Sequence, residues 1–149
     1  MQATFTPFAQ QDIEGITAMM QEFYGIDNYP MDVEKSKRLL KEFIVNDALG
    51  CGWQIVHNGH AVGYAILTFV FSFEYGGRIA FLDELFIGYE ARGLGLGKQT
   101  LDFIHREAQQ LGIKIIYLEV EEHNEIAQQL YLSKDFAVHN RKLMKLVVE

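Results

Sequence analysis

The sequence lacks most of the features that mark secreted, metal-binding or nucleic-acid-binding proteins. It has one cysteine, Cys51, so no internal disulfide can form, which favours a reducing, cytoplasmic setting. Its five histidines are scattered, and no close pair of Cys or His residues has the spacing of a zinc site, so we expect no metal. The net charge is -7 and no basic stripe is present, which disfavours a nucleic-acid partner.

Long hydrophobic runs are also missing. The longest, Ala61 to Phe71, is about half the length that a membrane helix requires. The opening residues do not resemble a secretory signal, and we expect no membrane association. Apolar residues make up 49% of the chain, enough for the core of one domain spanning residues 1–149.

Hydrophobic periodicity and Gly or Pro punctuation divide the chain into roughly seven strands and four helices. The pattern predicts an α+β fold with a mixed central sheet. We expect strands at residues 2–8, 53–57, 61–71, 78–87, 114–120, 136–138 and 143–148. Helices are expected after Asp12, from about Asp32 to Asn46, from about Gly95 to Leu111, and from Glu125 to Ser133.

Several details of this arrangement are specific enough to test. Asn58-Gly59 predicts a tight antiparallel hairpin. Strand 114–120 follows a helix, so we expect it to lie parallel to strand 78–87. The apolar edge of strand 143–148 is a candidate homodimer surface, with a monomer as the alternative. The second helix is expected to carry Leu39, Leu40, Phe43 and Ile44 toward the core.

A glycine-rich loop, Arg92-Gly93-Leu94-Gly95-Leu96-Gly97-Lys98, lies between a predicted strand and the third helix. Amides at a helix start lack intrahelical partners and carry partial positive charge, so this loop suits an anion such as a diphosphate. The alternative is a tight turn with Leu94 and Leu96 packed inward. A P-loop fails at Arg92 and Gln99. A dinucleotide loop would place its third glycine at Lys98 or Thr100, although Glu119 fits the ribose-binding acid and keeps this interpretation open.

Written as Arg92-x-x-Gly95-x-Gly97, the loop resembles the acetyl-CoA signature R/Q-x-x-G-x-G/A of the GCN5-related N-acetyltransferase (GNAT) family. Leu82 to Ile87 resembles the family's fourth strand. Asn124 to Tyr131, closing with Phe136, resembles its N-x-x-A-x-x-L-Y-x-x-x-G-F segment. The three segments follow the family's order and spacing, so the resemblance covers nearly the whole chain.

Two positions depart from the family pattern. Tyr89 stands where a proline is usual, and Asp135 stands where a glycine is usual. Neither touches the expected chemistry, but Asp135 must accept a turn conformation that glycine adopts more easily.

The resemblance implies that the fourth and fifth strands are parallel and splayed, and that the pantetheine arm of acetyl-CoA enters the gap. It also implies that the glycine loop holds the diphosphate. The cofactor-binding residues expected from the resemblance are Phe86, Ile87, Arg92, Gly93, Leu94, Gly95, Leu96, Gly97, Lys98, Asn124 and Tyr131.

Acetyl transfer to an amine needs a base and an acid. Strand alternation sends Asp83 and Glu84 to opposite faces. Asp83 matches the family's usual base position, whereas a bulge in the strand would reverse the parity and favour Glu84. Tyr131 is the candidate general acid because its phenol is mostly protonated at pH 7, unless the ring only packs. Cys51 is interpreted as a packing residue.

These features together predict an acetyl-CoA-dependent N-acetyltransferase. The acceptor is expected to be a primary amine of a small molecule or peptide that attacks directly in a ternary complex. The alternative is a non-catalytic acyl-CoA-binding sensor or interaction module.

Overall fold

The computed structural model describes residues 2–149, which divide into two compact units, one ending at Glu119 and the other comprising Val120–Glu149. The described strands are β1 Thr4–Pro7, β2 Gly50–His57, β3 His60–Ser72, β4 Gly77–Ile87 and β5 Ile116–Tyr117. The α-helices are α1 Ile13–Ile26, α2 Val33–Ile44, α3 Leu96–Gln110 and α4 Glu125–Ser133, with short 3-10 turns at Gln10–Asp12 and Tyr89–Ala91. Only α4 belongs to the second unit.

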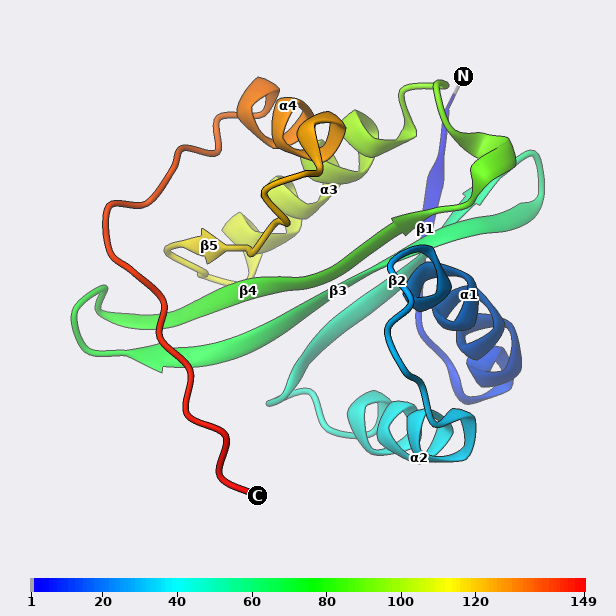
Figure 1. Ribbon diagram of the computed structural model, residues 1–149, viewed down its shortest axis with the longest axis horizontal. Coiled ribbons are helices and arrows are strands. Elements are labelled where there is room, and N and C mark those ends of the chain that lie inside the picture. Colours follow the sequence, from blue (N-terminus) through cyan, green and yellow to red (C-terminus); the bar gives the residue numbers. More distant parts are fainter. Residues whose placement is uncertain (1) are drawn as a thin grey trace. The chain divides into compact units, whose positions relative to one another are not determined.

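The five described strands form one sheet in the order β1-β2-β3-β4-β5 (Figure 1). The first three pairings are antiparallel, and β4 and β5 are parallel, as predicted. The predicted hairpin between β2 and β3 is confirmed. Asn58 and Gly59 have φ angles of 51° and 77°, the left-handed region that such a turn requires. The mixed α+β fold is therefore confirmed.

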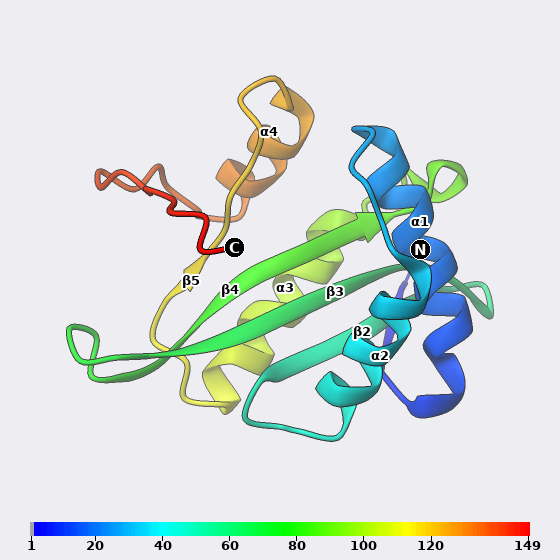
Figure 2. The same cartoon turned by 60° about the horizontal axis from the view of Figure 1, so that its bottom comes forward.

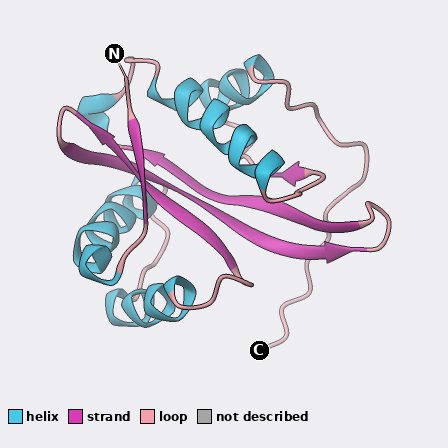
Figure 3. Ribbon diagram, turned by 180° about the vertical axis from the view of Figure 1, so that it is seen from behind, coloured by secondary structure: helices cyan, strands magenta, loops and turns pink. Residues whose placement is uncertain are grey.

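Helices cover both faces of this sheet. In Figures 1 and 3, α1 and α2 lie on one face and α3 lies on the other. On the first face, α1 and α2 lie side by side (Figure 2). The core on that face combines Ile16 and Met20 of α1 and Leu40 of α2 with Tyr64 and Phe86 of the sheet.

The opposite face is sealed by aromatic contacts with α3. The ring of Phe103 stacks on Phe5 with a centroid distance of 4.2 Å and meets Trp53 edge-on at 5.2 Å. The start of α3 is tied to the chain before β1, because the Gln99 side chain accepts a hydrogen bond of 2.8 Å from the Ala3 amide. These contacts fix the position of α3 against the sheet.

The second helix confirms its predicted start but corrects one core residue. Asp32 is the N-cap, and its side chain accepts a 3.0 Å hydrogen bond from the Lys35 amide. Leu40 is buried and Phe43 packs against the core, but Leu39 is 53% exposed. Leu39 lies about 100° around the helix from Leu40, outside the stripe that faces the sheet. The expectation that Leu39 points to the core is therefore wrong.

The sheet has five strands, not seven. The predicted strand at 114–120 shortens to Ile116–Tyr117. The predicted strands at 136–138 and 143–148 are absent. Strand propensity measures the fit of a residue to a paired, half-buried surface, and neither segment pairs within the described chain. The homodimer prediction consequently loses the apolar strand edge on which it depended.

Three broader expectations concern location, metal binding and domain count. Within residues 2–149, no helix combines the length and apolar composition needed to cross a bilayer. The expectations of a single domain, a cytoplasmic location and no metal stay predictions.

The close approach of β3 to β4 at Gly63 predicts a stability effect. A Cβ atom at Gly63 would lie 2.1 Å from the Phe86 carbonyl oxygen, a backbone atom that cannot move aside alone. Gly63→Ala should therefore destabilise the fold by about 1–3 kcal/mol or more, measured by denaturant unfolding. Gly15→Ala on α1 is the control, because its Cβ would meet nothing within 4 Å and should leave stability equal or higher. Equal stability of the two variants would contradict this account of the β3–β4 contact.

Candidate active site

The glycine loop leads directly from β4 into α3. Gly93 and Gly95 have φ angles of 77° and 80°, a left-handed conformation that side-chain-bearing residues rarely adopt. Gly95 is the N-cap of α3. Leu96 is buried, whereas Leu94 is 41% exposed, so only one of the two leucines packs inward. The loop is thus shaped by its glycines and anchored by Leu96.

The amides of this loop are open to a ligand. None of the backbone N–H groups from Gly93 to Lys98 donates a hydrogen bond within residues 2–149. The bonds of the helix backbone begin with the Gln99 amide, which donates to the Gly95 carbonyl. A Cβ at Gly93 or Gly95 would meet nothing within 4 Å, so no other part of the unit crowds the side-chain positions of these two glycines. Open amides at the head of a 15-residue helix fit a diphosphate.

Two cations flank these amides in the sequence. The Nε atom of Arg92 donates a 2.9 Å hydrogen bond to the Ile87 carbonyl, and its guanidinium lies 5.9 Å from the centre of the Tyr89 ring. Arg92 therefore fastens the loop to the end of β4. Lys98 lies in the first turn of α3 and is exposed. Its ammonium remains accessible to an anion.

The pairing of β4 with β5 involves only the first half of β4. In the described chain β4 pairs with β5 only at Ala80 and Phe81, and from Leu82 onward its only strand partner is β3. The parallel pairing is therefore confirmed, and the splaying of the two strands stays a prediction. The carbonyl of Phe86 faces Gly63 of β3, whereas that of Ile87 accepts the Arg92 bond. Phe86 and Ile87 are the strand residues predicted to contact a pantetheine arm. Of these two, Ile87 is the one whose carbonyl accepts a hydrogen bond from outside the sheet, from Arg92.

A β-bulge separates the two candidate bases. Ile66 lies opposite Glu84 and Leu67 lies opposite Leu82, so Asp83 is an extra residue in β4. The β-bulge that would favour Glu84 over Asp83 is therefore present. It turns Glu84 to the face of the sheet that α1 covers, where it meets side chains from another part of the chain.

Glu84 is bound by two tyrosines that sequence analysis missed. Tyr24 of α1 donates its phenol proton to Glu84 Oε2, and Tyr64 of β3 donates to Glu84 Oε1, each at 2.6 Å. Burial raises the pKa of Glu84, and the two hydrogen bonds oppose that rise. One signal was present in the sequence. Tyr64 interrupts an apolar strand, and a buried phenol normally requires a hydrogen-bond partner.

Asp83 has a different environment. It is the more exposed of the two acids, and its carboxylate makes no hydrogen bond or ion pair within residues 2–149. Partial burial raises the pKa of Asp83 above its ordinary value. Among the described residues, Asp83 is thus a carboxylate without a hydrogen bond, next to Glu84, whose two oxygens both accept one.

The second unit holds the remaining predicted residues. Asn124 is the N-cap of α4, and its side-chain oxygen accepts a 3.1 Å hydrogen bond from the Ala127 amide. The ring of Tyr131 packs edge-on against Phe136 at 5.6 Å, and burial raises the pKa of its phenol. Asp135 has a φ of 70°, the turn conformation expected where glycine is usual. Tyr131 is thus a packing aromatic whose phenol remains protonated.

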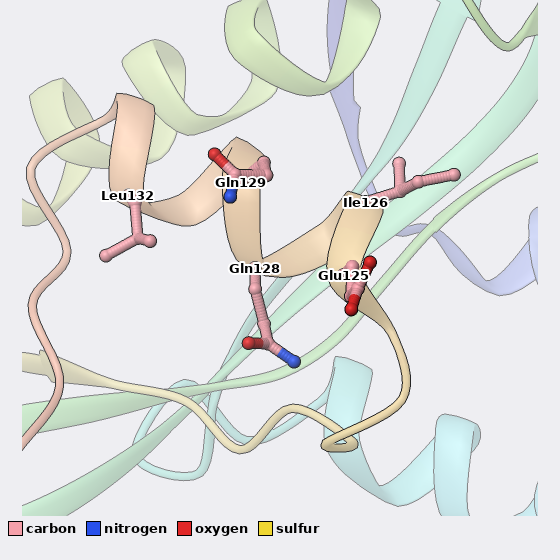
Figure 4. A pocket seen from close by; sticks show the side chains of 5 residues that line it. All are labelled: Glu125, Ile126, Gln128, Gln129 and Leu132. Carbon is pink, nitrogen blue, oxygen red and sulfur yellow. The ribbon is translucent and has the colours of Figure 1, made fainter.

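A depression on the surface of α4 contains none of these residues. It is lined by Glu125, Ile126, Gln128, Gln129 and Leu132 (Figure 4). Ile126 is 87% exposed, and the Gln128 amide is already bound to the carbonyls of Glu121 and Glu122. All five lining residues come from α4 alone.

The chain matches a protein-family model over most of its length. Residues 16–136 match the model of the Acetyltransferase (GNAT) family, well over half of the chain. The chain belongs to this family. The resemblance of its three motifs to GNAT proteins is therefore confirmed.

The similar proteins and solved structures are distant from this chain in sequence. A D-amino-acid N-acetyltransferase of Saccharomyces cerevisiae, HPA3, is 23% identical over 125 residues, covering 81% of this chain and 76% of the relative. An integron cassette protein from the mobile metagenome of Cole Harbour Salt Marsh has a TM-score of 0.88 at 27% identity, covering 97% of this chain and 90% of its own. An aminoglycoside N-acetyltransferase solved with CoA has a TM-score of 0.83 at 15% identity, covering 99% and 95%.

Proposed function

We propose that this GNAT protein transfers an acetyl group from acetyl-CoA to a primary amine of a small molecule or peptide, by direct attack in a ternary complex. The observation that carries the proposal is the row of open amides from Gly93 to Lys98 at the head of α3. Arg92 and Lys98 add formal positive charge to this row. The donor set suits the diphosphate of a coenzyme A molecule.

Acetyl-CoA, when bound, supplies the acetyl group as an activated thioester. The chain must remove a proton from the acceptor, because an alkyl amine with a pKa near 10 arrives protonated. Asp83 takes this proton, since its carboxylate is unengaged and its pKa is raised toward the working range. The backbone N–H near Ile87 donates to the acetyl oxygen. Tyr131 gives its phenol proton to the departing sulfur as the carbon–sulfur bond breaks.

Isothermal titration of the intact protein with acetyl-CoA and with CoA tests the loop. Saturable binding is expected, and Gly95→Val should weaken it by at least about tenfold, because a branched side chain disfavours the φ of 80° that aims the amides. Gly76→Val is the matched control. Gly76 has a φ of 76° and equally open surroundings, but it lies in the turn between β3 and β4. Equal loss of affinity in both variants, or no binding to the wild type, would refute the loop assignment.

Release of free thiol from acetyl-CoA tests the transfer itself. A suitable amine panel contains spermidine, lysine, kanamycin and D-phenylalanine, which span polyamine, amino acid and aminoglycoside acceptors. At least one amine should accelerate thiol release well above hydrolysis, with a product heavier by one acetyl group in mass spectrometry. Binding of acetyl-CoA without transfer to any panel amine would instead support a sensor or interaction module.

A further inference from the structure

The Glu84 carboxylate is held by two elements that are far apart in the sequence. Tyr24 comes from the last turn of α1 and Tyr64 from the middle of β3, and each occupies one of the two carboxylate oxygens at 2.6 Å. Such hydrogen bonds to a charged acceptor are short and strong. Their effect is to fix both the direction of the carboxylate and its distance from α1.

The aromatic residues around this contact hold the phenols in place. Tyr64 is fully buried, and the ring of Phe23 lies 6.3 Å from Tyr64 and 5.4 Å from Phe86. Phe23 also contacts its neighbour Tyr24 at 6.0 Å. Tyr64 cannot turn away without disturbing this cluster, so it orients Glu84 before any ligand arrives.

The bulge gives the two adjacent acids unequal freedom. Each oxygen of Glu84 accepts a hydrogen bond from a phenol. The Asp83 carboxylate accepts no hydrogen bond within residues 2–149. Burial raises the pKa of Glu84, and the two phenol donors oppose this rise while they occupy both of its oxygens. An acid beside it with no donor is free to take a proton. The pair therefore contains one carboxylate that two phenols hold in place and one that is available to accept a proton.

We propose that Tyr24 is a positioning residue of the acceptor site: with Tyr64 it fixes Glu84 as the anion that binds the acceptor's ammonium group, while Asp83 takes the proton. This inference rests on the proposed acetyl transfer to an amine. It adds two tyrosines to the site and gives the two acids different roles.

The groups that face Glu84 are Tyr24 from α1, Tyr64 from β3 and Asp83 from its own strand. Burial, followed by the interactions with Glu84, raises the pKa of Tyr24 far above its ordinary value, and burial and the Glu84 charge do the same for Tyr64. Both phenols therefore remain donors at any working pH. Loss of the Tyr24 bond removes one of two influences that lower the pKa of Glu84, and the carboxylate should then take up a proton at a higher pH.

Steady-state kinetics of Tyr24→Phe, with the panel amine that the wild type acetylates fastest, tests the proposal. The variant should raise KM for the amine by about 3- to 10-fold, with kcat within about twofold and acetyl-CoA affinity unchanged. The acid-side limb of kcat/KM should move to higher pH. Tyr75→Phe is the matched control, because the Tyr75 phenol bonds to the Tyr117 phenol at 2.9 Å instead of to an acid, and its kinetics should match the wild type.

A double-variant cycle separates positioning from a general structural effect. In the Glu84→Gln background, Tyr24→Phe should change KM by no more than about twofold, because the anion that it positions has already been removed. An additional loss of the same size in that background overturns the proposal. An unchanged KM in the single variant, or a loss of acetyl-CoA affinity with it, overturns it as well.

A second measurement does not depend on how the variants fold. In wild-type protein saturated with CoA, adding the same amine should shift the carboxyl carbon resonance of Glu84 in a ¹³C spectrum, and an unchanged resonance overturns the proposal. If the wild type turns over no panel amine, the proposed function fails and this inference fails with it. If the wild type is active and Tyr24→Phe behaves like Tyr75→Phe, this inference fails alone.

Discussion

Tyr131→Phe should lower the turnover of acetyl transfer by roughly 100 to 10,000-fold while acetyl-CoA still binds. The substitution removes only the phenol oxygen. The edge-on contact between ring 131 and Phe136 is kept, so the packing of α4 should change little. A large loss of turnover with unchanged cofactor affinity therefore isolates proton donation from packing.

The pH profile gives an independent test of the same role. A general acid must be protonated, so activity should fall as the pH rises through the phenol's pKa, which burial raises above the ordinary value near 10. The basic-side fall should be absent in Tyr131→Phe if a residual rate remains measurable. Thiol release under saturating substrates measures both effects, with Tyr75→Phe as the control. A normal rate in Tyr131→Phe would remove Tyr131 from the mechanism and leave it as a packing residue.

Local signals predicted the helices and the first hairpin because each depends on neighbouring residues. The N-cap Asp32 and the turn pair Asn58-Gly59 act within a few residues of their own positions, and the structure confirms both. The glycine loop was likewise predictable. Glycine adopts positive φ angles more readily than other residues, so the conformation of Gly93 and Gly95 could be expected from the sequence.

Non-local pairing explains what the sequence did not reveal. The apolar residues from Leu143 to Val148 have strand-like composition, but composition cannot say whether a partner strand exists, and Val148 is 91% exposed. The bulge at Asp83 is a mismatch between two strands and has no unambiguous mark in either. Tyr24 meets Glu84 across 60 positions of the chain. Such contacts form only when the chain has folded. They are the basis of the different roles proposed for Asp83 and Glu84.

The assignment of the base makes the second prediction with a large effect. Asp83→Asn should lower kcat by roughly 100 to 10,000-fold, because an amide cannot accept the proton of the acceptor amine. Asn keeps the size of the side chain, and Asp83 makes no hydrogen bond within residues 2–149 that would be lost. The fold and the affinity for acetyl-CoA should therefore be preserved, as checked by thermal unfolding and calorimetry.

Glu84→Gln is the matched comparison that distinguishes the two acids. It removes the fixed anion but leaves Asp83, so it should raise KM for the amine more than it lowers kcat. The fall in rate at low pH gives a further test of the two roles. A base must be ionised, so kcat falls as the pH drops through the raised pKa of Asp83. This limb of the kcat profile, unlike the kcat/KM limb that Glu84 influences, should persist in Glu84→Gln and vanish in Asp83→Asn. The reverse pattern, with kcat lost in Glu84→Gln and kept in Asp83→Asn, would show that the tyrosine-bound acid takes the proton, and that its phenol contacts tune a base instead of fixing an anion.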